Sequence, residues 1–265
     1  MTPACKPARG LAEGVAVRGV RTLLPETEAV IAAMAVPPSA ARAALMDNLV
    51  AALKTCGAWG RFDGLFLTAA HEAQAARVNW AAPEEPGLNP VNSPVFHADS
   101  GYEGDGATSY LETGRRQGQG LYLPEDHHAG LWATSATGSG TAWGNGRNRI
   151  IPFTSGSVLA TRSNAGATVS TPVSAGVGHS AFSRAAADRY RVFKDGVLLN
   201  EAEASTLTAV NQEFILLGYG TTTSVTGLSS WRVGALHFGA ALEDSAMSAV
   251  AAALGRYLEG LSTWA

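Results

Sequence analysis

The chain has 265 residues, a formal net charge of -3, 46% hydrophobic residues and only 15% charged residues. This balance is typical of a folded protein with a sizeable core, and the slightly acidic charge disfavours nucleic acid or an anionic membrane surface as a partner. No stretch approaches the roughly 18 consecutive apolar residues of a membrane span, and two cysteines, Cys5 and Cys56, are too few for a disulfide framework.

The first 25 residues contain three prolines, Pro3, Pro7 and Pro25, together with three glycines and little periodicity. Such a segment does not form a stable element alone, because proline removes backbone donors and no apolar face repeats. We therefore expect residues 1–25 to be an extended arm that becomes ordered on a partner surface.

Residues 26–80 are expected to form a helical N-terminal region. Apolar residues recur at helical spacing from residue 26 until Pro37 and Pro38 stop the chain. Ser39 is a good N-cap for a second helix, and Gly57 stands where a helix often ends in a left-handed residue. A short strand at 62–67 and a brief helix at 71–77 complete this region.

Residues 81–265 change character after a proline-rich connector and become rich in glycine, serine and threonine. Short apolar runs separated by turn residues predict an antiparallel β-sandwich of two packed sheets. The clearest hairpin covers 189–199, where Asp195-Gly196 favours a type I′ turn. A closing helix over 243–259, with one apolar stripe, should pack on the sandwich. Further strands are predicted at 120–123, 131–134, 149–153, 158–162, 179–183, 214–219 and 231–238.

Catalytic patterns are not found in the sequence. Nucleophile elbows, phosphate loops and dinucleotide loops need glycines at fixed spacing, and none of these patterns occurs. The paired carboxylates of a sandwich glycosidase should alternate along one strand, whereas Glu84-Glu85 lie in a connector and Glu201 with Glu203 in a predicted loop. We therefore expect a protein that is not an enzyme and needs no cofactor.

Two groups of residues invite a metal interpretation. Asp126-His127-His128 could supply ligands, but neighbouring histidines in a strand point to opposite faces, so a solvated turn is the preferred interpretation. The second group, in a glycine-rich loop, could bind calcium, although its spacing does not match an EF-hand. We expect turn structure and no metal there as well. This second group comprises Asp99, Glu103 and Asp105.

The best candidate ligand-binding loop lies between two predicted strands. An aromatic ring, two asparagines and two arginines fall together there, and sugar-binding sandwiches combine flat apolar rings with hydrogen-bonding side chains. The candidate residues are Trp143, Asn145, Arg147, Asn148 and Arg149.

Two longer stretches, residues 66–80 and 92–114, resemble phage and prophage virion proteins of the tail-fibre type. The resemblance continues through the Tyr-Arg-Val-Phe-Lys-Asp-Gly hairpin at 190–196, the strand near Phe214 and the segment 235–244, and so covers about residues 40–260. It implies a concanavalin-like, laminin-G-type jelly-roll sandwich, mainly β, with N-terminal helices and a C-terminal helix packed on it. The resemblance supplies no catalytic residue.

The resulting hypothesis is a virion component of the tail, baseplate or head surface, assembled in the cytoplasm of a bacterial host. Its N-terminal region would bind other virion proteins, its sandwich would bind cell-surface polysaccharide, and it would form a homo-oligomer. Two alternatives stay open: a polysaccharide-degrading sandwich enzyme, and a purely structural spacer that binds no sugar.

Overall fold

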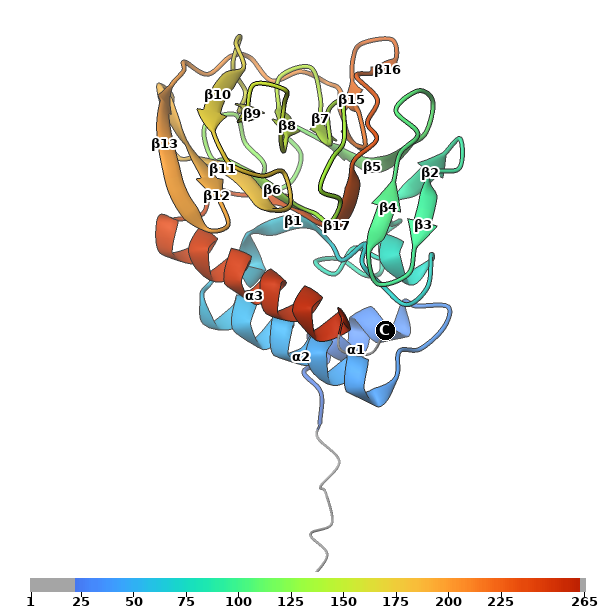
Figure 1. Ribbon diagram of the computed structural model, residues 1–265. Helices are drawn as coiled ribbons and strands as arrows, with labels where there is room; N and C mark the ends of the chain where they lie inside the picture. The colour runs from blue at the N-terminus through green and yellow to red at the C-terminus, as the bar shows by residue number, and fades with distance from the viewer. Residues whose placement is uncertain (1–21, 263–265) are drawn as a thin grey trace, which may run out of the picture.

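The computed structural model describes residues 22–262, and most of the predicted arm, residues 1–21, lies outside them. The chain folds as an antiparallel β-sandwich with helices at both ends, as the sequence predicted. The three α-helices all lie on one side of the strands (Figure 1). Their bounds are α1 (Pro25–Ala32), α2 (Ala40–Thr55) and α3 (Asp244–Ser262).

Sheet A has eight strands, in the order β13-β12-β11-β6-β17-β4-β3, with β1 also paired to β17. Because β1 comes from the region predicted as helical, part of that region belongs to the sandwich. The strands are β1 (Phe62–Phe66), β3 (Val95–His97), β4 (Gly101–Glu103), β6 (His127–Ala133), β11 (Gly178–Arg184), β12 (Arg189–Lys194), β13 (Val197–Glu203) and β17 (Arg232–Gly239).

Sheet B has seven strands, in the order β10-β9-β8-β7-β14-β5-β2, and a small hairpin of β15 and β16 lies beside it. Its strands are β2 (Asn89–Val91), β5 (Tyr110–Arg116), β7 (Trp143–Gly144), β8 (Arg149–Ile151), β9 (Val158–Arg162), β10 (Val169–Pro172) and β14 (Glu213–Leu216). The hairpin consists of β15 (Tyr219–Gly220) and β16 (Val225–Thr226).

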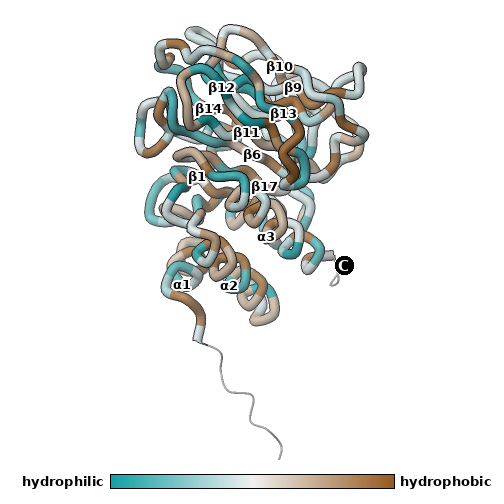
Figure 2. Tube along the Cα trace, turned by 90° about the vertical axis from the view of Figure 1, so that its left-hand side faces the viewer, coloured by the Kyte–Doolittle hydropathy of each residue, from teal (hydrophilic) through white to brown (hydrophobic). Residues whose placement is uncertain are grey.

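Sheet A is the middle of three layers, between sheet B and the helices. Figure 2 shows the helices below the strands in a second view, turned by 90°. All residues of β11 are buried, and so are all but one of β6 and all but one of β17. Burial on both faces follows from this position, because sheet B covers one face and α3 the other. Sheet B therefore has the free outer face of the sandwich.

The helical layer is held by caps and by apolar packing. Ser39 accepts a hydrogen bond from the Arg42 backbone N–H, as expected of an N-cap, and Gly57 follows α2 with a φ of 73°. Arg42 also forms an ion pair of 2.7 Å with Asp99, which ties α2 to the turn between β3 and β4. In α3 the buried face includes Val250 and Leu254, as predicted.

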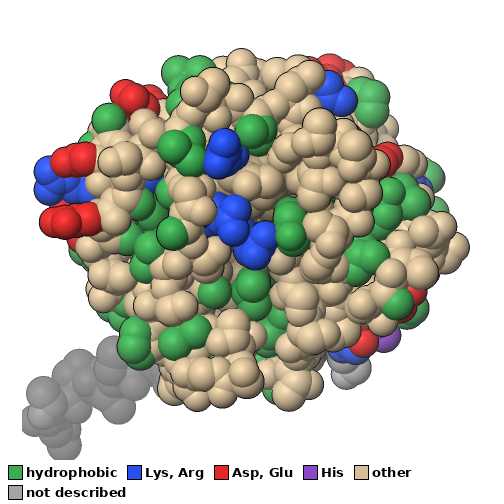
Figure 3. Space-filling view, turned by 90° about the horizontal axis from the view of Figure 1, so that it is seen from above, with side chains coloured by type: hydrophobic (Ala, Val, Ile, Leu, Met, Phe, Trp, Pro, Cys, Tyr) green, Lys and Arg blue, Asp and Glu red, His purple; other side chains and the backbone are tan. Residues whose placement is uncertain are grey.

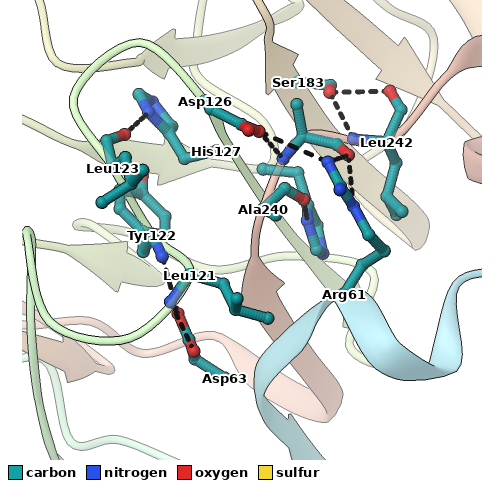
Figure 4. A network of polar contacts seen from close by, with 12 residues as sticks. Arg61, Asp63, Leu121, Tyr122, Leu123, Asp126, His127, Ser183, Ala240 and Leu242 are labelled. Atoms are coloured by element: carbon teal, nitrogen blue, oxygen red, sulfur yellow. Dashed lines mark hydrogen bonds and ion pairs between the residues drawn. The ribbon is translucent and has the colours of Figure 1, made fainter.

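A polar network fixes the loop before β6 to β1 and to the start of α3 (Figure 4). Asp63 of β1 accepts backbone hydrogen bonds from Leu121 and Tyr122, at 2.8 and 2.7 Å. Gly120 is required beside it, because a Cβ there would lie 2.3 Å from the Asp63 carboxylate and φ is +66°. Asp126 accepts from the Ala241 N–H at 2.7 Å.

Several predicted elements differ from the structure. The strand expected at 120–123 is this anchored loop, and the helix expected at 71–77 is reduced to a short 3₁₀ turn, Ala75–Arg77. The hairpin at 189–199 is confirmed, since Asp195 and Gly196 have φ angles of 50° and 77°. No helix among residues 22–262 has the length and apolar character to cross a bilayer.

A candidate ligand-binding face on the outer sheet

Strand pairing brings two arginines together on the outer face of sheet B. In the antiparallel pair of β8 and β9, Arg149 lies directly opposite Arg162. Ile150, the next residue of β8, is fully buried, so Arg149 points away from the core. Arg147 belongs to the tight loop between β7 and β8. Figure 3 shows basic side chains gathered near the centre of this side of the molecule, away from the acidic side chains at its margin.

These arginines are held by neutral groups. The Arg149 guanidinium carbon lies 4.0 Å from the centre of the Tyr219 ring, which is cation–π geometry. Arg162 donates to the Gly146 carbonyl at 3.0 Å and to the Thr168 hydroxyl at 3.3 Å. Within residues 22–262, no carboxylate forms an ion pair with Arg147, Arg149 or Arg162.

Each of the three arginines also has a buried Nε for which the described chain provides no acceptor. Burial lowers the pKa of Arg162, and the positive charges of Arg149 and Arg147 lower it further. Arg147 and Arg149 are therefore close enough for their charges to act on Arg162. The arrangement offers several N–H donors and positive charge on one open surface.

Two buried asparagines shape the loop that carries Arg147. The Asn145 side-chain oxygen accepts from the backbone N–H groups of Arg147 and Asn148, both at 2.9 Å. The Asn148 side-chain oxygen accepts from the Tyr122 hydroxyl at 2.9 Å and from the Asn164 N–H at 2.8 Å. Asn145 and Asn148 are fully buried, so the prediction that they contact a ligand is corrected: they position the loop.

Trp143 requires the same correction. Its ring is fully buried between the sheets and stacks on Phe214 and Phe238, with ring centres 4.8 and 6.0 Å apart. A buried indole cannot serve as a platform for sugar, so Trp143 belongs to the core. Of the five residues predicted for the ligand-binding loop, Arg147 and Arg149 reach the surface.

A shallow hollow of about 540 Å³ lies at the end of β8. Ile151 in its wall is two residues from Arg149 on β8, so the two side chains share one face of the strand. Phe153 adds an apolar surface, and hydroxyl groups come from the loops on either side. The lining residues are Ala136, Thr137, Gly138, Ser139, Gly140, Ile151, Phe153, Thr154 and Ser155.

Sequence reasoning missed Arg162 and Tyr219. A signal for Arg162 was present, because a hairpin turn centred on residues 154–157 places residue 162 opposite residue 149. Tyr219 carried no comparable signal, since β15 reaches β7 only through an isolated bridge between Asn145 and Gly220.

The three carboxylates of the predicted calcium group bind different partners and do not converge on one point. Asp99 pairs with Arg42, and Glu103 pairs with Arg232 and with His97. Asp105 accepts from the backbone N–H groups of residues 107, 108 and 109. Asp99 and Asp105 therefore lie in turns, which was the preferred interpretation, whereas Glu103 belongs to strand β4.

The paired histidines lie in β6 and not in a solvated turn, because both are fully buried. They point to opposite faces, as predicted. His127 stacks on Tyr122 between the sheets at 4.4 Å. On the face covered by the helices, Nε2 of His128 is 3.0 Å from Nδ1 of His237, whose Nε2 is 2.8 Å from Nε2 of His179. Among residues 22–262, no three His, Cys, Asp or Glu side chains are arranged to hold a metal ion.

Comparison with known proteins gives structural likeness only. No family model and no curated protein matches the chain. A solved structure described as a receptor binding domain has 9% identity and a TM-score of 0.49, covering 77% of this chain and 53% of its own. Domain 4 of the arabinanase AbnA from Geobacillus stearothermophilus, in complex with arabinotriose, has 16% identity and a TM-score of 0.45, covering 71% of this chain and all of its own. The CBM40 of the Ruminococcus gnavus IT-sialidase has 16% identity and a TM-score of 0.37, and the match covers 48% of this chain and 83% of the CBM40 chain.

Proposed function

We propose that this chain is a virion attachment protein that binds host-surface glycan through the outer face of sheet B. The observation that carries the proposal is the hollow at Ile151 and Phe153 beside Arg149, on the sandwich face that the helices leave open. Apolar walls with hydroxyl and guanidinium groups around them suit sugar rings, which present both C–H faces and hydroxyl groups. The sequence resemblance to tail-fibre-type proteins supports the virion setting.

A glycan array tests the proposal directly. The full chain should bind host-type glycans on the array, and the double substitution Ile151→Ser with Phe153→Ser should abolish this binding, because it removes the apolar wall without adding charge. Asn211→Ala, at an exposed site outside the hollow, is the matched control and should bind as the unaltered chain does. If the unaltered chain binds no glycan, it acts as a spacer and not as a glycan-binding protein. If the hollow variant binds as the unaltered chain does, the hollow is not the binding site.

We place the helical side toward the particle. The described chain begins beside α1, on the opposite side of the molecule from the strands of sheet B (Figure 1). A ligand on sheet B and a virion partner at the N-terminal region would therefore not compete for space. Deleting residues 1–25 should prevent incorporation into particles made in the host cytoplasm, and normal incorporation would contradict a docking role for the arm.

We propose binding without catalysis. A glycosidase needs two carboxyl groups about 5–10 Å apart that flank the bond. The described residues that line the hollow include none with a carboxyl group. Incubation with host capsule should release no reducing ends, and their release would favour the polysaccharide-degrading alternative.

We also propose that the chain self-associates through the tip of the β12–β13 hairpin. Strand β13 is an edge of sheet A, and three consecutive residues there, Val197, Leu198 and Leu199, are 59, 41 and 43% exposed. Val177 adjoins them, since its carbonyl accepts from Lys194 at the start of the turn. Exposed apolar residues on an open edge favour pairing with another chain. Light scattering should show an oligomer that Leu198→Lys dissociates.

A further inference from the structure

We infer that the ligand of this face carries an anionic group, a carboxylate or sulfate on a saccharide, bound between Arg147, Arg149 and Arg162. The inference rests on the proposed function and specifies the chemistry of its ligand. Three features of the described residues support it: like charges placed opposite each other, missing counter-ions, and donors without acceptors.

Like charges directly opposite in adjacent strands destabilise a sheet. Arg149 and Arg162 occupy such a pair, and Arg147 lies close enough to act on Arg162. Two other arginines on paired strands have acidic partners: Arg191 meets Glu201 across β12 and β13, and Arg232 meets Glu103 across β17 and β4. Arg184 of β11 forms no ion pair in the described chain either, but backbone carbonyls on several segments accept from its guanidinium. The unneutralised arginines therefore mark sheet B as a place for an external negative charge.

The donors point to an oxyanion in particular. A guanidinium presents N–H groups in a planar fork, which matches the oxygens of a carboxylate or sulfate. The Nε atoms of Arg147, Arg149 and Arg162 are buried, so a ligand would meet the outer nitrogens of these guanidinium groups. For the outer nitrogens of Arg147 and Arg149, the described chain provides no acceptor. Two of these arginines are also fixed in place, by Tyr219 and by the Gly146 carbonyl. A group with several acceptor oxygens would satisfy donors that the chain leaves unpaired.

A saccharide fits this place better than a nucleic acid. The chain is acidic overall, at -3, so it lacks the broad positive field that tracks a phosphate backbone. The positive charge of Arg149 and Arg162 lies at one cross-strand pair, and Arg149 shares its face of β8 with Ile151 in the wall of the hollow. One charged substituent at the arginines, with the rest of a sugar unit over the apolar wall, uses both parts of the surface.

Binding of the full chain to three soluble polymers tests the inference: polygalacturonate carries carboxylates, dextran sulfate carries sulfates, and dextran is neutral. We expect binding to at least one acidic polymer, none to dextran, and weakening as salt rises from about 50 to 300 mM. The double variant Arg149→Gln with Arg162→Gln should lose at least tenfold in affinity. Arg149→Lys with Arg162→Lys should retain part of it, because the charge remains and the fork is lost.

Arg256→Gln, on the exposed side of α3, is the matched control, and thermal melting verifies that every variant is folded. Undiminished binding of acidic polymers by the double glutamine variant would overturn the inference, as would binding of neither acidic polymer. Retention of neutral glycans alone would overturn it while leaving the proposed function intact. Acidic-polymer binding through these arginines without adsorption to host cells would instead overturn the proposed function alone.

Discussion

Acidification should destabilise this protein steeply, because four histidines are buried in the neutral form. Burial lowers the pKa of His127 to about 3, of His128 to about 4 and of His179 to about 3. Burial and the neighbouring histidines hold the pKa of His237 well below its ordinary value. In the unfolded chain these groups take up protons below about pH 6.5. On acidification the unfolded state therefore binds protons that the folded state does not bind.

The hydrogen bonds assign the neutral forms. Nδ1 of His128 must donate to the Ala240 carbonyl, so its Nε2 accepts from Nδ1 of His237. Nε2 of His237 then accepts from Nε2 of His179, whose Nδ1 is left buried without a partner in the described chain. An added proton would sit between sheet A and the helices, where Arg61 near His128 and Lys194 near His179 already contribute positive charge.

The magnitude follows from linkage. A folded-state pKa below the unfolded value stabilises fully above pH 6.5, and the stabilisation is lost as pH falls from 6.5 toward the folded pKa. At pH 5 each such histidine has lost about 2 kcal/mol, so the three with assigned values, His127, His128 and His179, lose about 6 kcal/mol together. Domains of this kind are stable by only about 5–15 kcal/mol, so most of the stability should be gone.

Urea unfolding followed by tryptophan fluorescence at pH 7.5, 6 and 5 measures this loss. His127→Gln should reduce the slope of unfolding free energy between pH 6 and 5 by about 1.4 kcal/mol per pH unit, the contribution of one proton. His71→Gln, at a partly exposed position, is the control and should keep the steep slope set by the buried histidines. A free energy of unfolding that changes by less than about 2 kcal/mol between pH 7.5 and 5 would refute the reasoning.

Substitutions at four further positions test the core, the hairpin turn and the cap of α2, each by urea unfolding at pH 7.5. Trp143→Ala should cost about 3–5 kcal/mol, because it empties the space that the indole fills against Phe214 and Phe238; a cost near zero would contradict its place in the core. Gly196→Ala should destabilise more than Gly114→Ala: both glycines have positive φ, but a Cβ at 196 would lie 3.0 Å from Ala251 and one at 114 meets nothing within 4 Å. Equal costs would show that α3 does not constrain the hairpin tip. Ser39→Ala should cost about 1 kcal/mol by removing the cap of α2, and Ser39→Asp should restore it.

The features predicted well from sequence are those set by neighbouring residues. Ser39, Gly57 and the Asp195-Gly196 turn act on their own backbone, so caps and hairpin appear where expected. The segment 120–123 was misassigned because its conformation depends on Asp63, far away in sequence. Residues 71–77 have helical composition, but the Ala73 carbonyl accepts from the Tyr102 hydroxyl, a tertiary contact that no local pattern reveals.

The sequence located the loop of the candidate site but could not identify which of its residues contact solvent. Composition drew attention to the loop at 143–149, but it could not separate residues that reach solvent from those that support the loop. Asn145 and Trp143 are polar and aromatic like ligand-binding residues, yet both are buried. What separates them from Arg149 is strand phase, and phase depends on how β7 and β8 pair.

The order of the layers determines where a large ligand can bind. The central strands of sheet A have no free face, because sheet B covers one side and the helices the other, and the buried histidines lie in these strands. A polymer must therefore meet the outer face of sheet B or the loops around it. On that face, β8 and β9 carry Arg149 and Arg162 opposite each other, a pairing that sheet stability alone disfavours. Folding alone gives no reason for two like charges to lie opposite each other on this open face, whereas the binding of an anionic ligand does.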